Sequence, residues 1–277
     1  MYQFPPLKQV IDQYGLAAKK SLGQHFLLDG RITDDIARYA GDLTSYNVIE
    51  VGPGPGGLTR SLLKTGAKKL YVIEKDARCL AIMQDIKSIV GEQLEIIHGD
   101  ALEVDIESIP APRKIVANLP YNAGTQMLLN WLDMVYHNPA AIESMTLMFQ
   151  KEVAERITAT HGNKDYGRLS IISQWLCEVR TDMELPPGAF VPPPKVSSQV
   201  VTLTTRSRPL VDVKKETLEK VVAAAFGQRR KMLRQALKPL GADTEKLLHD
   251  AGIDGTLRAE QVDLPGLCRL AQAYETL

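Results

Sequence analysis

Short apolar, β-branched runs recur through the first half of the chain, at intervals of about 20 to 25 residues. They are residues 47–51 (NVIEV), 70–74 (LYVIE), 94–98 (LEIIH) and 114–118 (KIVAN). Stretches with helical character lie between them, at 57–65 and 77–90. Strands that alternate with helices in this way predict βαβ units and a parallel sheet.

The same pattern continues to about residue 205 and then changes. A fifth strand is expected at 144–149, helices at 150–160 and 168–177, and two last strands at 178–184 and 198–205. After Arg208-Pro209 only helices are expected, at 214–226, 228–238, 243–251 and 263–275. The sequence therefore predicts an α/β domain over 1–205, with a mostly parallel seven-stranded sheet, and a small all-α domain over 206–277.

Composition narrows the class of protein. Hydrophobic residues make up 44% and charged residues 24% of the chain, which is typical of a globular protein. No run approaches 18 apolar residues, so no membrane span is predicted. Cysteines 79, 177 and 268 have no metal-site spacing, which favours free thiols and no metal. The N-terminus resembles neither a secretory signal nor a transit peptide, so we expect a cytoplasmic location.

The zero net charge hides a segregation of charge. Residues 206–238 contain ten basic and three acidic residues, a net charge of +7, whereas 239–277 carry −4 and 1–205 carry −3. Arg230, Arg234 and Lys238 are spaced to form one stripe on the helix expected there. Such a stripe suits a phosphate backbone, and a solvated helix face is the alternative.

A glycine-rich turn, EVGPGPGGLT, follows the first strand of the sheet and precedes a helix. Gly52, Gly54 and Gly57 satisfy GxGxxG, which first suggests a dinucleotide-binding dehydrogenase. Two prolines in the turn remove N–H donors that a pyrophosphate needs. Glu74 ends the second strand and can bind ribose hydroxyls, and Asp100 follows the third and can accept from an adenine amine. An acid at each of the first three strands is a set that suits an adenosine carrying a cation rather than a pyrophosphate, and S-adenosylmethionine is such a ligand.

The tetrapeptide Asn118-Leu119-Pro120-Tyr121 follows the fourth strand. An exocyclic adenine amine is a poor nucleophile because its lone pair is delocalised into the ring. The side-chain oxygen of Asn118 and the backbone carbonyl of Leu119 can accept its two hydrogens and favour a pyramidal nitrogen. Tyr121 offers a ring on which the base can stack. This pattern resembles the signature of amino-methyltransferases that act on nucleobases.

Three further segments resemble one family, the small-subunit ribosomal RNA adenine N6,N6-dimethyltransferases. They are KKSLGQHFLLD at 19–29, FVPPPKVSS at 190–198 and FGQRRKMLRQAL at 226–237. The resemblance implies a Rossmann-like class I fold with a cofactor-capping segment at 1–30. It also implies transfer of two methyl groups from S-adenosylmethionine to each of two adjacent adenosines near the 3′ end of 16S rRNA, in the assembling 30S subunit, with S-adenosylhomocysteine as product.

The resemblance also implies roles for individual residues. His25, Leu27 and Gly52 would contact the methionine end of the cofactor, Glu74 its ribose and Asp100 its adenine. Gly54 and Ala101 would also bind the cofactor. Asn118 would contact both cofactor and target amine, and Tyr121 and Phe190 would sandwich the target base. RNA would bind at Arg229, Arg230, Lys231 and Arg234. His25 departs from the family pattern, because bacterial members commonly have asparagine there.

Four alternatives stay open at this point. The 23S rRNA dimethyltransferases that confer macrolide resistance share the catalytic motifs, although the RRKMLRQAL segment favours the small-subunit enzyme. An assembly factor whose methylation is secondary is a rival from another class. A mitochondrial transcription factor derived from the same family is disfavoured by the N-terminus, and a dehydrogenase gives no role to Asn118-Tyr121. Because the substrate would be far larger than the enzyme, we expect a monomer with no membrane partner.

Overall fold

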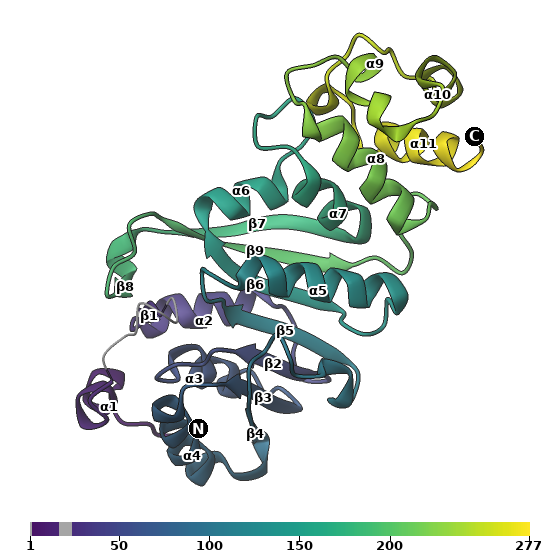
Figure 1. The fold of residues 1–277 in the computed structure, drawn as a ribbon. Coiled ribbons are helices and arrows are strands. Elements are labelled where there is room, and N and C mark those ends of the chain that lie inside the picture. The colour runs from purple at the N-terminus through teal and green to yellow at the C-terminus, as the bar shows by residue number, and fades with distance from the viewer. Residues whose placement is uncertain (1, 17–23) are drawn as a thin grey trace. The chain divides into compact units, whose positions relative to one another are not determined.

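A seven-stranded sheet organises the first part of the chain in the computed structural model, which describes residues 2–16 and 24–277. Its strand order is β4-β3-β2-β5-β6-β9-β7 (Figure 1). The strands are β2 (Asn47–Val51), β3 (Lys69–Glu74), β4 (Leu94–His98), β5 (Arg113–Asn118), β6 (Ser144–Gln150), β7 (Cys177–Leu185) and β9 (Ser198–Thr205). β2 to β6 pair in parallel and β9 pairs antiparallel with β6. The predicted α/β class and mostly parallel sheet are confirmed.

The strand order creates a switch point between β2 and β5. From β2 the chain steps outward to β3 and β4 and then returns to β5 on the other side of β2. Ligands of open α/β sheets bind in the crevice at the carboxyl ends of such strands. All five residues of β2 are buried, as a central strand covered on both faces requires.

Helices precede the sheet and connect its strands along the chain. They are α2 (Gly30–Tyr39), α3 (Gly57–Lys64), α4 (Ala77–Val90), α5 (Gly124–His137) and α6 (Lys151–Thr158), with α1 (Leu7–Gln13) near the N-terminus. The side chains of Asp29 and Asp76 cap α2 and α4 by accepting from backbone N–H groups in the first turn. The apolar periodicity predicted α3, α4 and α6, whereas α1, α2 and α5 were not expected.

A second, two-stranded sheet ties the N-terminal segment to the proline-rich loop. β1 (Phe26–Leu27) pairs antiparallel with β8 (Phe190–Val191), with Leu27 opposite Phe190. Only part of the motif expected at 19–29 is visible in this sheet, because residues 17–23 lie outside the described residues. The pairing brings residues 25–27 to the glycine-rich turn, since a Cβ on Gly57 would lie 2.7 Å from the carbonyl oxygen of Leu27.

By its contacts, the chain falls into two compact units, Met1–Ala154 with Arg180–Thr205, and Glu155–Val179 with Arg206–Leu277. The second unit contains α7 (Arg168–Leu176), α8 (Lys215–Gly227), α9 (Leu233–Ala236), α10 (Thr244–Ala251) and α11 (Leu264–Glu275). This division groups residues 155–179 with the C-terminal helices, whereas the sequence placed them with the sheet. The domain boundaries expected from the sequence stay a prediction.

The helix expected at 228–238 is not formed, so that part of the prediction is wrong. Residues 228–231 form a turn and Met232 forms a β-bridge with Arg258. α9 is only four residues long, and a 3-10 turn follows at Lys238–Leu240. The N–H of Leu233 donates to Leu257 and that of Arg234 to Gly255, at 2.7 and 3.0 Å. This tertiary pairing overrides the helical propensity of the segment, and Pro239 prevents the helix from continuing. Arg230, Arg234 and Lys238 therefore do not form one helical stripe.

Candidate active site

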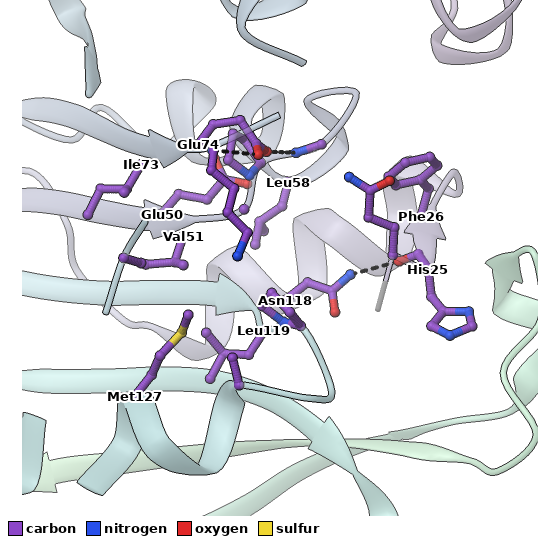
Figure 2. A pocket seen from close by; sticks show the side chains of 18 of the residues that line it. His25, Phe26, Glu50, Val51, Leu58, Ile73, Glu74, Asn118, Leu119 and Met127 are labelled. Atoms are coloured by element: carbon purple, nitrogen blue, oxygen red, sulfur yellow. Dashed lines mark hydrogen bonds between the residues drawn. The ribbon is translucent and has the colours of Figure 1, made fainter. Parts of the chain in front are cut away.

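One pocket lies at the carboxyl ends of β2, β3, β4 and β5. It collects ten of the residues that the sequence singled out: His25, Leu27, Gly52, Gly54, Glu74, Asp100, Ala101, Asn118, Leu119 and Tyr121. Figure 2 shows Glu50, Glu74 and Asn118 approaching it from β2, β3 and β5. Phe190 does not line this pocket; its ring is buried in the core of the first unit.

The glycine-rich turn needs its glycines for two reasons. Gly52, Gly54 and Gly56 have φ values of 66°, 54° and 87°, which residues with a Cβ rarely adopt. A Cβ on Gly56 would also lie 2.7 Å from Cδ1 of Ile86 on α4. Gly56 was not part of the GxGxxG pattern, although its role in the turn is at least as strict. The turn thus lets the backbone between β2 and α3 approach a ligand closely.

Glu74 is fixed at the end of β3 by backbone donors. Its Oε1 accepts from the N–H groups of Lys75 and Asp76, both at 2.8 Å, and its Oε2 from Gly54 at 3.4 Å. Burial raises the pKa of Glu74, and these backbone hydrogen bonds oppose the rise. The long bond to Gly54 leaves Oε2 able to accept from a hydroxyl of a ligand.

Asp100 presents a second acceptor in the loop after β4. Its Oδ1 accepts from the N–H of Leu102 at 3.1 Å, and its Oδ2 pairs with Nζ of Lys75 at 3.0 Å. The backbone hydrogen bond from Leu102 and the ammonium of Lys75 lower the pKa of Asp100. The carboxylate is therefore ionised at neutral pH and can accept a hydrogen bond from an amine.

Glu50, the acid of the first predicted strand, was assigned no individual role from the sequence, although it lines the pocket. Its side chain is buried, and its Oε2 has no hydrogen-bond partner among the described residues. Burial raises the pKa of Glu50 to about 8, and the negative charge of Glu74 adds to the rise. The available signal was its position as the acid two residues before Gly52.

Asn118 is held by the N-terminal segment. Its Nδ2 donates to the backbone carbonyl of His25 at 3.1 Å, as the dashed line in Figure 2 shows. Because this bond uses the amide nitrogen, the acceptor atom Oδ1 remains available with respect to the described residues. Leu119, the next residue, is buried. Oδ1 of Asn118 is thus an acceptor at the end of β5, where we expected the target amine from the sequence.

Tyr121 stacks on the side chain of His25. The ring centroids are 5.1 Å apart with an angle of 27° between the planes. The hydroxyl of Tyr121 forms a short hydrogen bond with that of Ser198, and Nδ1 of His25 donates to the carbonyl of Pro192 at 2.8 Å. Burial raises the pKa of Tyr121. An aromatic partner for Tyr121 is thus present, but it is His25 rather than Phe190, and the base sandwich stays a prediction.

The four residues expected to bind RNA differ in their surroundings. Arg229 donates through Nη2 to the carbonyls of Lys164 and Tyr166, at 2.7 and 2.9 Å, and pairs with Glu260 at 3.3 Å. This guanidinium therefore anchors the loop before α7. Arg230, Lys231 and Arg234 are exposed, and no ion pair of theirs is found among the described residues.

Neither a metal cluster nor a membrane helix is found in residues 2–16 and 24–277. No three His, Cys, Asp or Glu side chains are grouped there so that they could hold a metal ion. The three cysteines are buried and form no disulfide. None of the helices in this part of the chain combines the length and the apolar character needed to span a bilayer.

Comparison with known proteins identifies the family. Residues 15–275 match the family described as ribosomal RNA adenine dimethylase. The chain is 56% identical over 272 residues to ribosomal RNA small subunit methyltransferase A of Jannaschia sp. strain CCS1, covering 98% of this chain and 94% of that protein.

Two solved structures share the fold. One is a dimethyladenosine transferase from Plasmodium falciparum, with 26% identity, a TM-score of 0.79, and coverage of 91% of this chain and 98% of that one. The other is the 23S rRNA methyltransferase ErmE, with 25% identity, a TM-score of 0.70, and coverage of 90% and 99%. The family match spans both the pocket and the C-terminal helices, so the chain belongs to the ribosomal RNA adenine dimethylase family.

Proposed function

We propose that this protein transfers methyl groups from S-adenosylmethionine to N6 of two adjacent adenosines near the 3′ end of 16S rRNA, within the assembling 30S subunit. The observation that carries the proposal is the position of Asn118-Leu119-Pro120-Tyr121. The tetrapeptide ends β5 at the switch point and lines the same pocket as Glu74 and Asp100. A cofactor site and a nucleobase-amine site thus share one crevice.

The pocket fits an adenosine that carries a positive charge. Glu74 would hold the ribose hydroxyls, and Asp100 with Ala101 would hold the adenine edge. His25, Leu27 and the glycine turn at Gly52 and Gly54 would lie at the methionine end. The buried Oε2 of Glu50 has no hydrogen-bond partner among the described residues, which supports a cationic ligand, because an isolated buried carboxylate is unfavourable without a counter-charge.

The residues of this chain would act mainly by positioning. Bound S-adenosylmethionine supplies a methyl group already activated by its sulfonium. Oδ1 of Asn118 and the carbonyl of Leu119 accept from the target amine and localise its lone pair, while Tyr121 stacks on the base. Each transfer would form one N–CH3 bond, break the S–CH3 bond of the sulfonium and release one proton from that nitrogen to the solvent. S-adenosylhomocysteine leaves as the second product, and no strong general base is needed.

The RNA contact is proposed for the exposed cations of the second unit. Arg230, Lys231 and Arg234 lie in the turn and short helix that follow α8, where no acidic residue occurs between 226 and 238. Lysine and arginine contacts to phosphates supply most non-specific RNA affinity. The substrate implies a bacterial cytoplasmic location, and the protein would act as a monomer on the much larger subunit.

A 23S rRNA dimethyltransferase is the main alternative, because ErmE shares the fold at 25% identity. The small-subunit methyltransferase of Jannaschia is much more similar, at 56% identity over nearly the full chain. This difference favours 16S rRNA as the substrate. An assembly factor with secondary methylation would need the same subunit contact without the chemistry of Asn118.

The test uses tritiated S-adenosylmethionine and 30S subunits from a strain that lacks N6,N6-dimethyladenosine, with 50S subunits in parallel. We expect label only in 30S subunits, located by primer extension on two adjacent adenosines of the 16S 3′ region. Asn118→Ala should abolish transfer and leave subunit binding nearly intact. Label in 50S subunits alone would indicate the resistance-type enzyme. Binding of 30S subunits without label would favour the assembly-factor function.

A further inference from the structure

Glu50 is a buried acid without a complete set of partners. It lies in β2, one of the two strands that form the switch point, and the residue is 1% exposed. Its Oε2 lacks a hydrogen-bond partner among the described residues, although Glu50 lines the pocket. A buried carboxyl group that lines a ligand site in this way is a candidate for a change of protonation state when the ligand binds.

Glu74 makes the ionised form of Glu50 still less favourable in the empty pocket. Glu74 comes from β3, the parallel neighbour of β2, and is 6% exposed. Three backbone N–H groups stabilise the carboxylate of Glu74, whereas hydrogen bonds from Thr59 alone lower the pKa of Glu50. Two adjacent buried acids do not both ionise readily, so the negative charge belongs on Glu74 and the proton on Glu50.

We propose that Glu50 holds a proton in the empty pocket and releases it when S-adenosylmethionine binds, so that its carboxylate faces the positive charge of the cofactor. The inference rests on the proposed function. One O–H bond of Glu50 breaks, the proton passes to the solvent, and the cation of the ligand takes its place. Glu50 is thus a binding residue whose ionisation is coupled to cofactor occupancy.

Other titratable groups line the same pocket, and each differs from Glu50 in its surroundings. They are Glu74, the Lys75–Asp100 ion pair, His25 and Tyr121. The pair is closed at 3.0 Å, and the lowered pKa of Asp100 leaves no proton to release at neutral pH. Burial raises the pKa of Tyr121, which therefore stays protonated. Comparison of variants separates Glu50 from Glu74 and His25.

Isothermal titration calorimetry of the full chain with S-adenosylmethionine tests the coupling. Titrations in buffers of different ionisation enthalpy give the number of protons released per cofactor. A pH of 6.5 is suitable, because the α-amino group of the ligand, with a pKa of about 7.7–8.0, is already protonated there. We expect the wild type to release close to one proton more than Glu50→Gln. The difference should fall towards zero by about pH 9, as Glu50 ionises in the empty protein.

Glu95→Gln is the matched control, since Glu95 lies on β4 outside the pocket and pairs with Lys69 at 3.1 Å. It should release as many protons as the wild type. An equal release from Glu50→Gln, or cofactor binding by the wild type without release, would overturn the inference alone. No binding of S-adenosylmethionine to the folded wild type would overturn the proposed function and the inference together.

Thr59→Val provides a second variant if circular dichroism shows that Glu50→Gln does not fold. Loss of the hydrogen bond from the Thr59 hydroxyl removes one interaction that favours the ionised form of Glu50, whereas the backbone hydrogen bond from Thr59 remains. We expect proton release by Thr59→Val to persist to higher pH than in the wild type. An unchanged pH dependence of release would contradict the assignment to Glu50.

Discussion

The imidazole of His25 covers one face of the Tyr121 ring, with 5.1 Å between the centroids. Two further bonds hold this arrangement, from Nδ1 of His25 to Pro192 and from Asn118 to the carbonyl of His25. The segment before β1 therefore touches Asn118 and Tyr121, two of the residues expected to handle the target base. A base that stacks on this face of Tyr121 must first displace the imidazole.

His25→Asn should make that face accessible. Asparagine is smaller and has no ring, yet it keeps a polar side chain for the cofactor. We expect the KM for the RNA substrate to fall severalfold while the KM for S-adenosylmethionine stays within about twofold, because aromatic pairs contribute about 0.5–1.5 kcal/mol. Steady-state methyl transfer with each substrate varied in turn measures both constants. A higher KM for the cofactor with an unchanged KM for RNA would instead identify His25 as a cofactor contact only.

Tyr121→Ala should weaken the interaction with the target base. Loss of base stacking on an aromatic ring costs about 1–3 kcal/mol, so kcat/KM for RNA should fall about 5- to 150-fold. Tyr121→Phe is the control, since it keeps the ring and loses only the hydrogen bond to Ser198. We expect Phe to retain most of the activity. If kcat/KM falls equally in both variants, the hydroxyl of Tyr121 rather than its ring is responsible for the effect.

Arg229 and Arg230 are adjacent in the chain but should respond differently to substitution. Arg229→Ala removes the donors to Lys164 and Tyr166 and should lower the free energy of unfolding by about 1–2 kcal/mol. Arg230→Ala should change it by less than about 0.5 kcal/mol. Urea unfolding of both variants measures the difference.

RNA binding should show the opposite order. If Arg230 contacts one phosphate, Arg230→Ala should weaken binding and make the negative slope of log K against log salt shallower by about 0.7–0.9. The guanidinium of Arg229 is already hydrogen-bonded within the protein, so Arg229 is less able to contact a phosphate. Filter binding of a 16S fragment at several salt concentrations distinguishes the two residues. An unchanged slope for Arg230→Ala would mean that this cation lies away from the RNA.

Particular residues show how far the sequence could predict this structure. The short apolar runs predicted all seven strands of the main sheet because strand periodicity is local. The meeting of Glu74, the last residue of β3, with Asp100, after β4, at one edge follows from the parallel topology. The prediction of a helix at 228–238 was wrong because this segment pairs with residues 255–258, and no local pattern contains such a long-range contact. The burial of Phe190 and the stacking of His25 depend likewise on the pairing of β1 with β8, across more than 160 residues of sequence.

Gly56→Ala should destabilise the first unit more than its backbone angle alone explains. Its φ of 87° disfavours any Cβ, and that Cβ would also meet Ile86 at 2.7 Å and Met83 at 3.0 Å. Gly66→Ala is the matched control, with a φ of 76° but only ordinary contact, to Thr44 at 3.7 Å. We expect Gly66→Ala to cost about 1 kcal/mol and Gly56→Ala about 2–4 kcal/mol in urea unfolding. Equal costs would show that Ile86 and Met83 move aside freely.

Glu50→Gln should stabilise the empty protein at neutral pH. The pKa of Glu50 is about 8 in the folded state and about 4.3 in the unfolded chain. Between these values the folded protein holds one proton more than the unfolded chain, so the free energy of unfolding of the wild type falls as pH rises. Glutamine does not titrate. The advantage of Glu50→Gln should therefore grow from about pH 5 to pH 8, reach about 2–4 kcal/mol and then level off.

Urea unfolding from pH 5 to pH 9 measures this effect, and Glu95→Gln is the control variant. Hydrogen bonding to Lys69 lowers the pKa of Glu95, so its carboxylate contributes stability above the unfolded pKa and loses it as pH falls. This ion pair is partly exposed, so Glu95→Gln should be slightly less stable than the wild type, with little change between pH 5 and pH 9. A parallel trend in both variants would mean that the pH dependence arises elsewhere. If Glu50→Gln raises the free energy of unfolding and Glu95→Gln lowers it, the unfavourable buried charge lies at Glu50, where a cationic ligand can neutralise it.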